Sequence, residues 1–189
     1  MIPARTLDFA PEDGDGRTRL SRLGGEPAWL DTPQWPLSSR HGEPMTFLAQ
    51  FVVPGENVTT YLFMDLRGTR SWRPDAGQNA LVLQPSGRIP PFITVVPLDA
   101  GPVLRDAAGH TVCHEARLTP FPLGADSTQH LGGHPNWLQG DEAPHGWTFL
   151  LQLDASQLRD AAVEFGDAGI GYAFVSPDRR EGRFLWQSA

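Results

Sequence analysis

An eight-residue phrase occurs twice in this chain of 189 residues, and it constrains the fold more than any other feature. Residues 23–30 read LGGEPAWL and residues 131–138 read LGGHPNWL, so six of the eight positions agree at an offset of 108. A second pair follows in the same order, because 45–51 (MTFLAQF) aligns with 147–153 (WTFLLQL) at an offset of 102. Offsets that differ by a few residues are typical of loop insertions in a duplicated unit. The pattern therefore predicts an internal repeat.

The two repeats are expected at about 21–100 and 128–189, within one domain that follows a flexible leader at 1–20. Each repeat begins with a Gly/Pro loop and continues as an antiparallel pair of strands, since its later segments are β-branched and aromatic. A short helix is expected at 156–165, SQLRDAAVEF. Further strands are expected at 80–84, 92–97, 114–118 and 183–187. We therefore expect an α+β fold that is β-rich and internally duplicated, with two similar antiparallel sheet units and few short helices.

The repeated residues have structural roles that follow from their chemistry. Glycine permits a positive φ, proline fixes φ, the tryptophan ring packs against its own sheet, and a glutamine among apolar neighbours bonds to backbone. These residues are Gly24, Gly25, Pro27, Trp29 and Gln50 in the first repeat and Gly132, Gly133, Pro135, Trp137 and Gln152 in the second. Gly166, Asp167 and Gly169 are expected to form a tight turn before an aromatic strand.

The chain resembles the YwqG-like family, a bacterial family of unknown function. The resemblance rests on a GG-x-P segment before Trp35-Pro36, an FLAQ strand at 47–50, a second G-x-P at 133–135, an LLQ strand at 150–152 and a GDAG turn at 166–169. It implies a mixed α+β fold with internal duplication, and it supplies no catalytic residue. Members of the family are similar to proteins encoded near secreted polymorphic toxins, where acidic neighbours serve as immunity proteins.

Composition excludes several classes of chemistry. All 15 basic residues are arginine, so the chain has no lysine for a Schiff base, a general base or a phosphate-binding loop. Cys113 is the only cysteine, which excludes an intrachain disulfide. Cys113 and His114 point to opposite faces if the segment is a strand, so they do not form a nucleophile–base pair. We expect no catalytic residue and no cofactor.

Histidines raise the question of a metal site. His130 and His134 flank LGG, and a turn could bring them to His145 and Asp141, although the spacing matches no strong ligand signature. The first repeat has no equivalent set, which favours surface or turn histidines. We therefore expect no metal site.

The net charge of −7 argues against binding to nucleic acid or to an anionic membrane, because both need a cationic surface. The N-terminal sequence lacks the apolar core of a signal peptide, and no segment approaches the roughly 18 apolar residues of a membrane span. These features favour a cytoplasmic protein.

Protein binding is the function that we favour from the sequence, because aromatic and arginine side chains dominate interface hot spots and acidic residues attract a cationic partner. The candidate contact residues are Trp35, Trp72, Arg70, Arg73, Asp141 and Glu142. The most concrete version is a non-enzymatic immunity protein that neutralises a cationic toxin domain. The alternative is a small-ligand-binding protein or a metal-dependent enzyme that uses a cleft between the two repeats.

Overall fold

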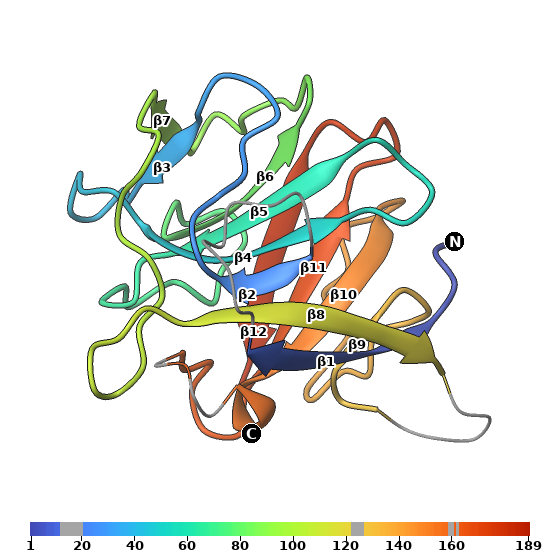
Figure 1. Ribbon diagram of the computed structural model, residues 1–189. Coiled ribbons are helices and arrows are strands. Elements are labelled where there is room, and N and C mark those ends of the chain that lie inside the picture. The colour runs from blue at the N-terminus through green and yellow to red at the C-terminus, as the bar shows by residue number, and fades with distance from the viewer. Residues whose placement is uncertain (12–20, 122–126, 159–160, 162) are drawn as a thin grey trace.

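The computed structural model describes residues 1–11, 21–121, 127–158, 161 and 163–189 (Figure 1). Regular structure in these ranges is almost entirely β-strand, and their one helical element is a 3₁₀ turn, η1 (Ala155–Gln157). No helix in these ranges has the length and apolar character that crossing a membrane requires.

Most strands belong to one antiparallel sheet of ten. They are β1 (Arg5–Pro11), β2 (Arg22–Gly24), β4 (Thr46–Val52), β5 (Thr59–Met64), β6 (Asn79–Gln84), β8 (Cys113–Pro120), β9 (His130–Leu131), β10 (Thr148–Asp154), β11 (Ile170–Val175) and β12 (Gly182–Gln187). Their order across the sheet is β12-β11-β10-β9-β1-β8-β2-β4-β5-β6. Two further strands, β3 (Trp35–Leu37) and β7 (Thr94–Val96), pair with each other as a separate small sheet (Figure 1).

The sheet curls until its two outermost strands, β6 and β12, meet. A Cβ atom added to Gly182 of β12 would lie 2.3 Å from the carbonyl oxygen of Leu81 in β6. Beyond these strands, Arg88 donates from its side chain to Asp178 and Glu181, each at 3.1 Å. The sheet is therefore nearly closed and barrel-like, and its two ends are held by side-chain packing and ion pairs.

The expected fold class is wrong in two respects. The protein is nearly all β and not α+β, and ten of its described strands form one continuous sheet in place of two similar sheet units. The physical reason is an exchange between the halves. Strand β1 precedes the first half but pairs with β9 of the second, whereas β8 precedes the second half but pairs with β2 of the first. Because β1 and β8 also pair with each other, they join both halves into a single ladder.

Two local expectations also need correction. Residues 5–11 are not part of a flexible leader, since they form β1 in the middle of the sheet, where the Leu7 side chain is completely buried. Residues 12–20 of that leader lie outside the described part of the chain. The helix expected at 156–165 is reduced to η1, which Asp154 caps by accepting a hydrogen bond from the backbone N–H of Ser156. Positions 159, 160 and 162 of that expected helix are also outside the described residues.

The curled sheet has an apolar interior and two aromatic clusters on its outer face. Leucines such as Leu48 and Leu150 fill the interior. Every residue of β5, β6 and β11 is buried, because these strands have the interior on one side and an aromatic cluster on the other. The cluster over β4–β6 also packs against β3 and β7, whereas the cluster over β10–β12 packs against Trp137 and Trp147.

Candidate binding pocket

The repeated loop of the first half is tied to its sheet by two side chains. Gly24 and Gly25 both have a positive φ, and a Cβ atom on Gly24 would lie 2.0 Å from a backbone oxygen, so the turn requires glycine there. The Gln50 side-chain oxygen accepts a hydrogen bond from the backbone N–H of Ala28 at 2.9 Å. The hydroxyl of Tyr61 donates to the carbonyl oxygen of Ala28 at 2.7 Å. These bonds fix the loop that carries Trp29.

The second half uses the same contacts. Gly132 and Gly133 have a positive φ, and a Cβ atom on Gly132 would lie 2.4 Å from a backbone oxygen. The Gln152 side-chain oxygen accepts from the backbone N–H of Asn136 at 2.9 Å, and the Tyr172 hydroxyl donates to the carbonyl oxygen of Asn136 at 2.9 Å. Burial raises the pKa of Tyr172 above its ordinary value, which keeps this phenol protonated as a donor.

Each repeated tryptophan then stacks on a phenylalanine of the sheet. The rings of Trp29 and Phe63 are 6.0 Å apart at an interplanar angle of 14°, and those of Trp137 and Phe174 are 5.9 Å apart at 15°. Trp29 and Trp137 therefore have matching surroundings, as their loop sequences predict.

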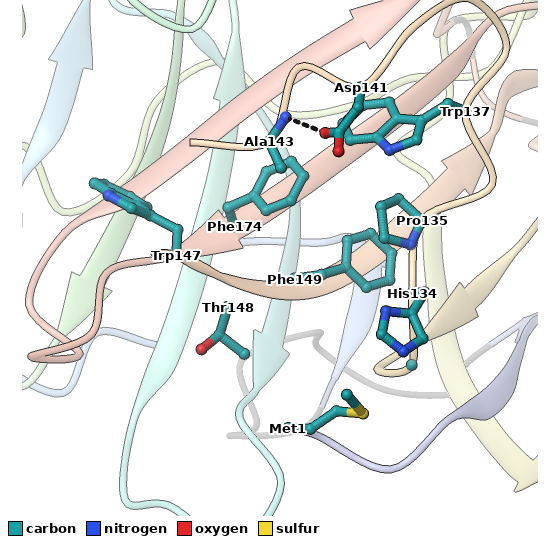
Figure 2. A pocket seen from close by; sticks show the side chains of 11 residues that line it. Met1, His134, Pro135, Trp137, Asp141, Ala143, Trp147, Thr148, Phe149 and Phe174 are labelled. Carbon is teal, nitrogen blue, oxygen red and sulfur yellow. Dashed lines mark hydrogen bonds between the residues drawn. The ribbon is translucent and has the colours of Figure 1, made fainter. Parts of the chain in front are cut away.

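An open pocket lies on the outer face of the second half, beside Trp137 (Figure 2). Its volume is about 530 Å³, within the usual range for ligand sites. It is lined by Met1, Gly133, His134, Pro135, Trp137, Asp141, Ala143, Trp147, Thr148, Phe149 and Phe174. Figure 2 shows Phe149 and Phe174 in the middle of this view, with Trp147 on one side and Trp137 and Asp141 on the other.

An arginine holds one aromatic wall of the pocket in place. The guanidinium carbon of Arg183, on β12, lies 5.5 Å from the ring centroid of Trp147 and 4.5 Å from that of Phe92. Arg183 also donates to the Glu181 carboxylate at 2.7 Å. A cation placed between two aromatic rings is an attractive arrangement, so Trp147 has support from the sheet.

The pocket rim is acidic. Asp141 and Glu142 are exposed in the loop that crosses this face, and Asp141 lines the pocket. One side-chain oxygen of Asp141 accepts a hydrogen bond from the backbone N–H of Ala143 at 2.9 Å, which orients the carboxylate. A bound group with a positive charge near the rim would find a favourable field.

The other predicted contact residues do not gather at this pocket. Trp35 is completely buried in the aromatic cluster on the first half's outer face, so its side chain is not part of the exposed surface, contrary to the prediction from its polar loop. Trp72 is 44% exposed, and the guanidinium carbon of Arg73 lies 5.7 Å from its ring centroid. Arg70 and Arg73 line a separate hollow of about 470 Å³ near Arg40.

The histidines considered as ligands do not converge on one point. His130 is 2% exposed, and its two ring nitrogens each lie 3.0 Å from a backbone carbonyl oxygen, of Ser127 and of His134. The described residues contain no group of three or more His, Cys, Asp or Glu side chains placed to hold a metal ion. His134 lines the pocket, whereas His145 and Cys113 lie outside its lining.

The turn at 166–169 depends on its glycines. Gly166 has a φ of +75°, and a Cβ atom on Gly169 would lie 1.7 Å from the carbonyl oxygen of Phe165. The backbone oxygen of Asp167 accepts a hydrogen bond from Ala189 at 3.0 Å. The turn thus has a structural role and lies outside the lining of the pocket.

The seam along which β6 and β12 meet is tightly packed. The cavity between β6, residues 89–93 and the start of β12 has a volume of only about 10 Å³, which is barely enough for one water molecule. Open space between the halves lies elsewhere, in a hollow of about 310 Å³ that is smaller than the pocket beside Trp137 and is lined by Met64, Leu66, Gly68, Ser71, Glu164, Gly166 and Trp186.

The sequence predicts that the Trp137 ring packs against its own sheet, and it does not directly indicate the pocket that Trp137 and Trp147 line. The signal is the change in repeat offset from 108 to 102. Fifteen residues separate Trp29 from Met45, but only nine separate Trp137 from the matching Trp147. The second loop is six residues shorter, and two of its residues, Asp141 and Ala143, line the pocket.

Comparison with known proteins places part of the chain in a described group. Residues 103–182 match the model of a domain of unknown function (DUF1963). The match is less than half of the chain, and it contains every pocket-lining residue except Met1. No curated protein matches the chain, and no solved structure matches it. The narrower YwqG-like resemblance stays a prediction.

Proposed function

We propose that this protein is a binding protein that holds a polypeptide partner at the pocket of the second half. The observation that supports this proposal is an open cavity of about 530 Å³ with aromatic walls and an acidic rim. Aromatic side chains with a polar edge are the groups that anchor most interfaces. The wall residues Trp137 and Trp147 are both only partly buried, so their rings are accessible to a partner.

Charge favours a basic partner. The chain has 22 acidic and 15 basic residues, and two of the acidic ones, Asp141 and Glu142, lie at the pocket loop. Opposite charge raises association rates and disfavours acidic competitors. In its narrowest form, the proposal is an immunity protein that covers a cationic toxin domain. Co-expression of the wild-type protein should restore growth to cells that express such a toxin domain. Co-expression of a variant whose pocket is filled, Ala143→Trp, should not restore growth.

A peptide-display library tests the proposal because it samples many candidate partner sequences at once. The library is panned against the wild-type protein and against Ala143→Trp, which places an indole in the pocket from an exposed loop position. Ala107→Trp, at an exposed turn far from the pocket residues in sequence, is the matched control. We expect basic and aromatic peptides that bind the wild type and Ala107→Trp but not Ala143→Trp. Enriched peptides that bind all three proteins equally would contradict the proposal.

A small-ligand role is the second candidate, because the pocket volume is also suitable for a compact organic molecule. A thermal-shift screen of uncharged aromatic and cationic compounds would distinguish the two. Hits that stabilise the wild type but not Ala143→Trp, together with a display experiment that enriches no peptide, would favour a small ligand.

A further inference from the structure

We propose that the pocket binds the indole ring of a tryptophan on the partner polypeptide, in the position that Trp35 occupies in the first half. This inference rests on the proposed function, because it names the side chain that the partner inserts. The side chain is derived from the protein's own structure. In the first half, Trp35 already packs on the aromatic face in the way that we expect a partner's tryptophan to pack on the second half.

The floors of the two outer faces are equivalent. Strands β4 and β10 each have a register irregularity at the same place, between Phe47 and Ala49 and between Phe149 and Leu151. The rings of Phe47 and Phe63 are 5.3 Å apart at 58°. In the second half, the rings of Phe149 and Phe174 are 5.7 Å apart at 65°. The same aromatic surface is therefore present twice.

In the first half, Trp35 covers this surface. Its ring lies 5.1 Å from Phe63 at 64° and 6.2 Å from Trp29 at 63°, which are edge-to-face contacts. Its indole N–H donates to the carbonyl oxygen of Met45 at 2.8 Å. The side chain is completely buried, so the first half shows how an indole fits on this surface.

In the second half, the corresponding loop supplies no such ring. The loop between Trp137 and Trp147 reads LQGDEAPHG, without Trp, Phe or Tyr. The matching loop of the first half carries Trp35 and the rest of β3. The residues that would surround the missing ring, Trp137, Phe149 and Phe174, are walls of the pocket. The pocket is therefore the place that Trp35 fills in the first half.

The polar surroundings also suit an indole. Thr46 and Thr148 hold matching ladder positions, opposite Met64 and Val175, so the carbonyl of Trp147 corresponds to the acceptor that Trp35 uses. The backbone N–H of Trp147 already donates to Pro144 at 3.0 Å. The partner is therefore held by its ring and by the acidic rim, and not by pairing with the Trp147 N–H.

A titration with short peptides tests this inference. The probe is acetyl-Arg-Trp-Pro-Arg-amide, compared with the same peptide carrying Ala or 1-methyltryptophan in place of Trp. Binding is followed by calorimetry and by amide resonances of the ¹⁵N-labelled protein. We expect shifts at 133–149, affinity at least tenfold lower for the Ala peptide, and affinity about five- to tenfold lower for the methylated peptide, which lacks the indole N–H. The effect should be lost in Ala143→Trp and kept in Ala107→Trp.

Several results would overturn the inference. They are equal affinity for the Trp and Ala peptides, or shifts centred on the exposed Trp72 and not on the pocket. Display peptides that bind the wild type but not Ala143→Trp, and that contain no tryptophan, would support the proposed function. They would refute the inference that the pocket binds an indole. Failure of every peptide to contact the pocket would refute both. The comparison among the three peptides uses the wild-type protein, so its outcome does not depend on whether Ala143→Trp folds.

Discussion

Replacing Trp35 with alanine tests whether this ring is the essential cover of the first half's outer face. Removing a buried aromatic side chain costs about 3–5 kcal/mol, and Trp35 is completely buried with two edge-to-face ring contacts. The carbonyl of Met45 also loses its donor, which adds about 1 kcal/mol if water does not replace it. We expect the free energy of unfolding to fall by about 4 kcal/mol and Tm to fall by roughly 8–16 °C for a domain of this size.

Urea unfolding followed by far-UV circular dichroism is the appropriate assay, because it does not depend on tryptophan emission. Trp72→Ala is the control, and we expect it to cost less than about 1 kcal/mol because that ring is 44% exposed. Added indole should bind in the cavity of Trp35→Ala and partly restore its stability. At an indole concentration of about ten times Kd, the free energy of unfolding should rise by about 1.4 kcal/mol. If Trp35→Ala lowered the free energy of unfolding by less than about 1 kcal/mol, Trp35 would not be the essential cover of this face.

Three further predictions concern the sheet. Gly182→Ala should cost about 2 kcal/mol in thermal or urea unfolding, because the new Cβ would press on the Leu81 carbonyl, whereas Gly140→Ala should change stability by less than about 0.5 kcal/mol. Burial alone would raise the pKa of Asp154, but hydrogen bonds from its neighbours hold it below the ordinary value. Its stabilising effect is therefore full above the ordinary carboxyl pKa and is lost as the pH falls through the lowered one, so unfolding curves between about pH 5 and pH 2 should change less for Asp154→Asn than for the wild type. Gln152→Leu should lower the free energy of unfolding by about 2 kcal/mol, measured in urea, because a loop N–H loses its acceptor.

The strands were predictable because their side chains determine them locally. The segments expected at 80–84 and 183–187 coincide with β6 and most of β12, and 114–118 lies within β8. The repeated Gly-Gly loops also behave as their φ requirements predict. These features depend on short-range sterics and on short apolar runs between turn residues, which a single sequence displays directly.

The arrangement of the strands was not predictable in the same way. Nothing in the composition of residues 5–11 shows that this strand pairs across to the other half, since strand exchange is decided by long-range packing. The helix expected at 156–165 failed because the Asp154 cap is followed by only one 3₁₀ turn. Trp35 has polar neighbours in sequence, which suggested an exposed ring, but it begins β3 and its ring packs into the aromatic cluster over β4–β6.

The candidate site was hidden for a related reason. The aromatic residues of the second repeat have the same sequence signature as those of the first, so both sets are interpreted as core. Their difference lies in what covers them, and the sequence shows this only as a loop shortened by six residues between Trp137 and Trp147. Comparison of loop lengths between repeats, and not only of their shared residues, would have indicated the pocket.

A crystal structure of the protein with acetyl-Arg-Trp-Pro-Arg-amide tests the central claim most directly. The account predicts that the peptide's indole lies against Trp137 and Phe174, with its N–H directed at the carbonyl oxygen of Trp147, so that it superposes on Trp35 when the two halves are aligned. Electron density for the indole at any other surface, or a pocket that stays open while the peptide binds elsewhere, would contradict it.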